Sequence, residues 1–197
     1  MIVERLADLT GANLVGAKLS GANLDRIKLN QAKLNDVKLS GARLTKAKLT
    51  QVDLTDADLS GANLTGAELN EATLEGADLS RANLTEAILI NANLKNTFLI
   101  GANLQKADLE EVVLEGADMA GVKLRHANLK KANLKKVDLR RADLEHADFS
   151  KANLSSANFT GAKMSESLFI DADLTATKMD SADTTDTQFQ GAIGFKA

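Results

Sequence analysis

A strict five-residue repeat governs almost the whole chain. From Leu9 to Phe189, every fifth residue is large and apolar at all but one of 37 positions, with 29 Leu, four Phe, three Met and the exception Thr184. Two residues before each of these positions stands a small residue, which is Ala in 27 of the 37 cases. The residue between them is most often Asn or Asp, and 12 of the 13 glycines fall two residues after the apolar position. The unit is therefore Ala-(Asn/Asp)-Leu followed by two variable residues.

A period of five fits neither regular element. On an α-helix, residues five apart drift around the axis, and on a plain strand they alternate between faces. The pattern instead requires a backbone that returns to the same inward orientation every five residues. A short extended piece followed by a tight turn does this, and glycine at a single phase supplies the residue that tolerates a positive φ in such turns. Leu and the small residue then both point inward, and the other three positions point outward.

This unit resembles the repeat of the pentapeptide repeat protein family over nearly the whole chain. The resemblance implies an all-β fold, a right-handed quadrilateral parallel β-helix in which four repeats close one coil of 20 residues. About nine coils would form a single domain over residues 1–197, with repeats from about 7 to 191. The four-sided coil comes from the resemblance, because the period alone does not fix the number of sides.

Charged residues give an independent test of the 20-residue coil. In such a stack, residues i and i+20 would lie one strand spacing apart, about 4.8 Å. Opposite charges are more frequent than like charges at this offset, as in Lys33/Asp53, Lys48/Glu68 and Glu111/Lys131. Exposed ion pairs contribute only about 0–1 kcal/mol each, so we expect them to favour this register more than they stabilise the fold.

Composition excludes several classes of protein chemistry. The chain has no Cys, so disulfides, thiol catalysis and cysteine-ligated metals are ruled out. No nucleotide-binding, hydrolase or metalloprotease motif is present, and carboxylates on a convex rod would be solvated. We therefore expect no enzymatic activity, no catalytic residue and no cofactor. No apolar run reaches the ~20 residues of a membrane span, and residues 1–9 do not have the pattern of a signal peptide, so a cytoplasmic protein without membrane contact is expected.

Two histidines form the one arrangement in which a metal site is worth considering. His126 and His146 are 20 residues apart, and Glu166 follows one coil later. Two imidazoles and a carboxylate could hold zinc. The alternative, which we adopt, is a polar surface column without a metal.

Apolar residues at outward positions mark candidate partner contacts. Ile88 and Ile90 flank Leu89, and Phe98 and Ile100 flank Leu99 on what would be the opposite face. They are either scattered surface hydrophobics or contacts with a partner protein or a second copy. The C-terminal end carries Ile193 and Phe195, and we expect a weak homodimer through Phe195 or, alternatively, a tail that covers the last coil.

Charge along the chain falls into bands. Two bands are rich in bases: residues 18–48, with eight bases and two acids, and residues 123–151, with nine bases and four acids. Three bands are rich in acids: residues 53–78, with seven acids and no base, residues 108–118, with five acids, and residues 166–186, with six acids and one base. The net charge is only −3, and aromatic residues that could stack on bases are scarce, so nucleic-acid binding is not expected.

The expected function is a structural or protein-interaction solenoid. The alternative, implied by the resemblance, is a DNA mimic that binds a type II topoisomerase such as gyrase and protects it from poisons.

Overall fold

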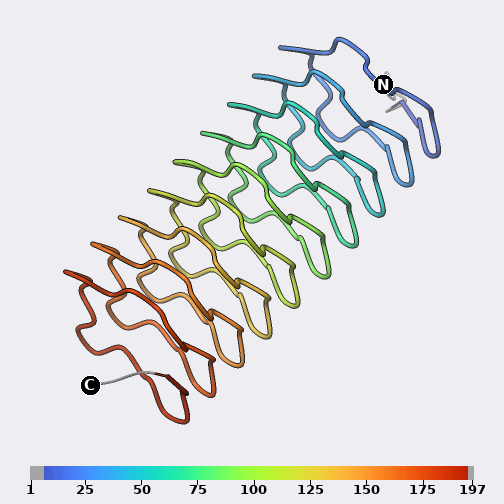
Figure 1. Cartoon of the computed structure of the whole chain (residues 1–197). Helices are drawn as coiled ribbons and strands as arrows, with labels where there is room; N and C mark the ends of the chain where they lie inside the picture. The colour runs from blue at the N-terminus through green and yellow to red at the C-terminus, as the bar shows by residue number, and fades with distance from the viewer. Residues whose placement is uncertain (1–6, 195–197) are drawn as a thin grey trace, which may run out of the picture.

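The chain winds into a stack of four-sided coils that form an elongated rod. The computed structural model describes residues 7–194, and its coils follow one another in chain order from one end of the rod to the other (Figure 1). Each of the 34 parallel bridges joins residue i to residue i+20, from Asp8↔Lys28 to Asp173↔Ile193. The described residues contain no helix. The right-handed all-β solenoid with a 20-residue coil is thus confirmed.

Each side of a coil is three extended residues with one bridging residue at the centre. Residues 7–9 are such a side, with Asp8 in the bridge, and residues 10–11 form the turn that follows. We name the sides by their bridging residues. Side A begins at Asp8, side B at Asn13, side C at Lys18 and side D at Asn23, and each continues with every twentieth residue.

The core consists of columns of the small and large residues of the repeat. Both inward positions are buried from Ile27 to Leu174, and Leu94, near the middle of the rod, has no exposed surface. In the end coils the inward residues are half-buried or exposed, as Leu9 is at 38%. Thr97 and Ser167 replace Ala at two of the inward positions, and their hydroxyls donate to the carbonyls of Leu94 and Met164. No buried side-chain nitrogen or oxygen among the described residues lacks a hydrogen-bond partner.

Turns between sides share one backbone conformation. The residue two after each core Leu has a positive φ, whether it is glycine, as at Gly41 (63°), or another residue, as at Lys46 (55°). The N–H of the next residue donates to the carbonyl of the core residue, as from Ala42 to Leu39 at 2.9 Å. A positive φ at the third residue of a four-residue turn is typical of the type II turn. The outward Asn or Asp supports the same turn, since its Oδ1 accepts the N–H two residues on, as from Thr85 to Asn83 at 3.1 Å.

Phenylalanine replaces leucine in the core towards the C-terminal end. Phe149, Phe169 and Phe189 form one stacked column, with ring centroids 4.8 and 5.5 Å apart. Phe159, from the opposite side of the coil, meets Phe169 edge to face at 5.9 Å. Phe149, Phe159 and Phe169 are fully buried, so these coils are filled by aromatic contacts.

Candidate functional site

Phe98 and Ile100 form an exposed apolar pair on side C. The exposed fractions are 48% for Phe98 and 44% for Ile100. Phe98 is a bridging residue between Asp78 and Asp118, and Ile100 begins the turn that follows. The sequence predicts both residues at outward positions, and the structure places them side by side on the surface.

Their exposure follows from the corner next to side C, which has few large side chains. We call this the glycine corner; at its positive-φ position it carries Gly21, Gly41, Gly61, Arg81, Gly101, Gly121, Arg141, Gly161 and Ser181. Ser80 and Ala120 occupy the turn positions one coil before and one coil after Ile100. A hollow lined by Ser60, Gly61, Ser80, Arg81 and Ile100 lies here, and a second hollow further along the corner is lined by Ala120, Gly121, Arg140, Arg141 and Thr160. Ile100 therefore borders open space.

Aspartates flank the apolar pair along side C. Successive bridges join Asp58 to Asp78, Asp78 to Phe98, Phe98 to Asp118, and Asp118 to Asp138. Each of the four carboxylates accepts the N–H two residues on, from Ser60, Ser80, Ala120 and Arg140 at 3.1, 2.8, 3.2 and 3.0 Å. Their positions are therefore fixed by the turns. The period of five does not single out this group, although every twentieth residue through Phe98 in the sequence shows it.

Only Asp138 of the four is paired with a cation of its own turn. Nε of Arg140 donates to both of its oxygens at 2.9 and 2.8 Å. This guanidinium is the main reason that the pKa of Asp138 lies below its ordinary value. The charge of Asp118 also acts on Arg140 and contributes to the raised pKa of that guanidinium. Asp58 and Asp78 accept hydrogen bonds from neutral groups of their own turns.

The other predicted contacts have different surroundings. Ile88 and Ile90 lie on side A, ten residues before Phe98 and Ile100 and so on the opposite side of the rod, and both are half-buried. Ile88 bridges Glu68 and Asp108, and the corner beside it carries Glu71, Asn91 and Glu111 in place of glycines. Phe195 lies outside the described residues. The greater exposure of Phe98 and Ile100 favours them over Ile88 and Ile90 as the partner contact.

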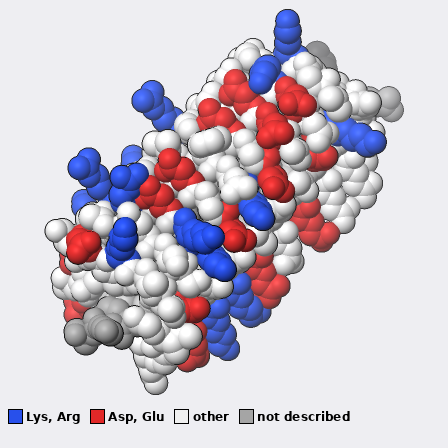
Figure 2. Space-filling model, viewed as in Figure 1, with Lys and Arg blue, Asp and Glu red and all other residues white. Residues whose placement is uncertain are grey.

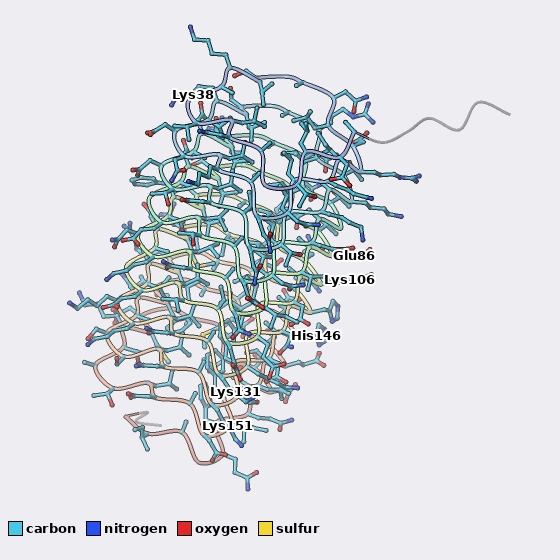
Figure 3. All side chains as sticks on the ribbon, turned by 90° about the vertical axis from the view of Figure 1, so that its right-hand side faces the viewer. Lys38, Glu86, Lys106, Lys131, His146 and Lys151 are labelled. Atoms are coloured by element: carbon cyan, nitrogen blue, oxygen red, sulfur yellow. The ribbon has the colours of Figure 1, made fainter. Side chains whose placement is uncertain are left out.

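Histidines 126 and 146 stack on each other in place of forming a chelate. Their ring centroids are 4.7 Å apart and the rings are within 2° of parallel. Nδ1 of His146 lies 3.4 Å from Oε2 of Glu166, and Glu86, Lys106 and His146 follow one another down this corner (Figure 3). Two parallel rings stacked one above the other lie in separate planes, so one ion cannot lie in both ring planes. The described residues contain no group of three metal-ligating side chains.

Charged side chains of both signs are interspersed on the rod surface (Figure 2). Several link adjacent coils, as Lys48 does to Glu68 at 3.6 Å and Lys131 to Glu111 at 2.9 Å. These two are among the pairs expected from the 20-residue register. Buried polar residues in the described part of the chain are the neutral Thr97 and Ser167. The acidic and basic groups thus lie at the surface.

Comparisons with known proteins identify the same repeat. The family model described as pentapeptide repeats matches in 8 copies, with overlapping segments over residues 7–169. HetL, a pentapeptide repeat protein involved in heterocyst differentiation regulation from the cyanobacterium Nostoc sp. strain PCC 7120, is 33% identical, with 95% of this chain and 89% of that chain covered and a TM-score of 0.47. QnrB1, a plasmid-mediated fluoroquinolone resistance protein, is 23% identical over 79% of this chain and 87% of its own, with a TM-score of 0.44. A pentapeptide repeat protein from the Arabidopsis thaliana thylakoid lumen is 30% identical over 67% and 71%, with a TM-score of 0.33.

Two further results bear on the class of protein. Comparison with curated proteins finds no match. Within residues 7–194, no helix is long and apolar enough to span a membrane.

Proposed function

Because this chain belongs to the pentapeptide repeat family, we propose that it is a non-enzymatic structural module that binds a partner protein through Phe98 and Ile100. The observation that carries the proposal is the exposure of these two side chains, 48% and 44%, in the middle of a side that is otherwise polar. Exposed apolar side chains rimmed by polar groups are typical of interaction sites, and aromatic residues such as Phe are enriched in the core of interfaces. The partner would bind along the flat outer surface of side C.

Site-specific photocrosslinking in the cells that make the protein tests this proposal. p-Benzoylphenylalanine replaces Phe98 in one variant and Val15 in a second. Val15 is 52% exposed, so it matches Phe98 in accessibility and lies about four coils away. We expect a discrete adduct with one protein at position 98 and none at position 15. An Ile100→Ser substitution should abolish the adduct at position 98, whereas Ile90→Ser on the opposite side should leave it unchanged. Equal adducts at both positions, or none at position 98, would overturn the proposal.

Topoisomerase protection by DNA mimicry stands as the competing proposal. Its support is the rod shape, but DNA carries a uniform charge of about one per 1.7 Å, whereas this chain has a net charge of −3 and two bands rich in bases. A gyrase supercoiling assay with a quinolone, with and without the protein, separates the two. Neither inhibition nor protection is expected.

The proposal also includes a second contact and a location. The C-terminal end, where Ile193 is 60% exposed, would join two copies weakly. The contact with the partner would take place in the cytoplasm, which cell fractionation tests.

A further inference from the structure

We propose that the partner presents a basic amphipathic helix that lies along side C, with an apolar residue on Phe98 and Ile100. The inference rests on the proposed function and names the chemistry of the partner. It follows from the charges that flank the apolar pair, from their spacing, and from the arrangements that these charges exclude.

The charges at the bridging positions directly beside Phe98 are acidic. Asp78 and Asp118 are the bridge neighbours of Phe98, and Asp58 follows one coil beyond Asp78. Asp138, at the other end of this run, is already engaged by Arg140. Asp58 has Lys38 as its other bridge neighbour. A partner that covers Phe98 therefore brings its own groups mainly against Asp78 and Asp118, and lysine or arginine at these places would gain from the contact.

The spacing of these residues matches a helix better than a strand. Successive bridging residues along the rod are about 4.8 Å apart, so Asp78 and Asp118 lie that far from Phe98 and Asp58 twice as far. On a helix, residues on one face recur after three or four positions, a rise of about 4.5–6 Å, and seven positions rise about 10.5 Å. On an extended strand, residues on one face are about 6.7 Å apart, so a strand parallel to the axis loses register after one step.

A second copy of this chain does not fit side C. In a two-fold dimer centred on Phe98 with the rods antiparallel, Asp78 would face the Asp118 of the other copy. With the rods parallel, Asp78 would face its own equivalent. Both arrangements place like charges opposite each other around an apolar contact, which is destabilising. A partner of opposite charge removes this conflict.

The adjacent corner leaves room for a helix. Gly61, Gly101 and Gly121 have no side chain beside the apolar pair, and the hollow next to Ile100 reaches to Ser60, Ser80 and Arg81. Arg81 Cγ would lie 4.0 Å from a Cβ added at Gly101, so the cation of Arg81 borders this hollow. A helix over Phe98 would therefore extend an apolar or acidic side chain towards Ile100 and Arg81, and its basic side chains would face Asp78 and Asp118.

A synthetic peptide tests the inference without knowledge of the partner. The probe is a fluorescein-labelled 15-residue helical peptide with Leu at its centre and Lys three, four and seven residues to either side, on an Ala background. Binding is followed by fluorescence anisotropy at 20 and at 150 mM salt, and the site by amide NMR shifts. We expect shifts centred on Phe98 and Ile100 and weaker binding at the higher salt, because exposed charge pairs are screened. The same peptide with Glu for Lys should not bind.

Two matched double variants locate the charges. Asp78→Asn with Asp118→Asn removes both charges next to Phe98. Asn at this position can still accept the N–H of the residue two further on, as Asn83 accepts that of Thr85. Glu68→Gln with Asp108→Asn removes the same charge next to Ile88 on the opposite side. We expect the first pair to weaken binding by roughly fivefold or more and to flatten its salt dependence, and the second to change neither.

The possible outcomes separate this inference from the proposed function. A crosslink at position 98 together with a peptide that does not bind, or that binds equally well to both double variants, overturns the basic helix and leaves the contact in place. A peptide that binds at Phe98 and loses affinity only in the first double variant supports the inference. Shifts that spread over the acidic band of residues 53–78 without affecting Phe98 would also overturn it, because binding would then be nonspecific.

Discussion

At the scale of single residues, the turns show how the coil is held in a conformation that most side chains disfavour. A positive φ costs a non-glycine residue roughly 1–2 kcal/mol, yet Lys, Arg, Glu, Asp and His occupy it throughout the rod. Neighbouring coils fix the backbone here, since the N–H of such a residue donates to the next coil, as from Gln31 to Thr50 at 2.9 Å. Each turn is therefore held by its own bond and by the coil beside it.

Exchanges of glycine at these turns should change stability in opposite directions. At Gly41 an added Cβ would meet no atom within 4 Å, so Gly41→Ala should cost only the backbone strain, about 1 kcal/mol. Lys46→Gly relieves the same strain at a φ of 55° and should be neutral or stabilising by a few tenths of a kcal/mol. Urea unfolding measures both. A stabilising Gly41→Ala would contradict the strain argument.

Carboxylates at bridging positions should make the rod acid-sensitive. Burial tends to raise the pKa of Asp53, but hydrogen bonds from the Thr55 hydroxyl, the Asn35 amide and the Thr55 N–H outweigh it, and the pKa lies below the ordinary 3.8. The pKa of Asp138 is lowered mainly by Arg140. A group with a depressed pKa in the folded state stabilises above its unfolded value and loses that effect as pH falls through its folded value.

Melting temperature should therefore be nearly constant between neutral pH and about 5 and should fall once the pH drops below the ordinary aspartate value. Circular dichroism melts across this range measure it. Asp53→Asn keeps an oxygen that can accept the Thr55 N–H but cannot titrate, so its melting temperature should fall less steeply. A parent protein that gains stability below pH 4 would contradict the assignment.

At the scale of the coil, stability depends on columns of side chains that continue from one coil to the next. A single coil contains four large core residues, each worth roughly 1.5–3 kcal/mol on burial, while ordering its 20 residues costs roughly 1–2 kcal/mol each. One coil cannot offset that cost alone, so neighbouring coils must cover its core and pair its backbone. A defect in one coil therefore weakens both neighbours.

Leu94 provides the test of this dependence. It is fully buried near the middle of the rod. Leu94→Lys would bury an unpaired charge and should cost several kcal/mol, whereas Leu94→Met should cost less than about 1.5 kcal/mol. Thermal and urea melts distinguish the two. Equal small losses for both variants would mean that this column is not a closed core.

The coils also show which features the sequence could predict. The inward position of Leu94 and the outward positions of Phe98 and Ile88 follow from the period of five. The difference in exposure between Phe98 and Ile88 does not, because it depends on residues in adjacent coils and at the neighbouring corner. The 20-residue register placed His126 next to His146, but the stacking of their rings depends on side-chain packing, which spacing does not describe.

At the scale of the whole molecule, the stack of described coils has two ends. In coils inside the rod, the N–H of the core residue donates to the next coil, as from Phe159 to Lys178 at 2.7 Å. Within residues 7–194, the N–H groups of Met179 and Thr184 in the last described coil make no such bond. Ile193 is 60% exposed at the same end. Open backbone edges with apolar residues favour association with another edge.

The C-terminal end should therefore give a weak dimer, because two copies that meet here pair their edges and cover Ile193. One such side chain contributes only about 1.5–3 kcal/mol, so backbone pairing must supply the rest. The competing arrangement is a tail that covers its own last coil. Its support is the close approach of Gly194 to the chain beneath it, where an added Cβ would lie 2.5 Å from Cα of Thr175.

Sedimentation over a concentration series decides between the dimer and the covering tail. Ile193→Asp and Phe195→Asp should each dissociate the dimer without changing the circular dichroism of the rod, and Val15→Asp at the other end should not. If the parent protein is monomeric at high micromolar concentration, the end-to-end contact is wrong and the tail acts as a cap.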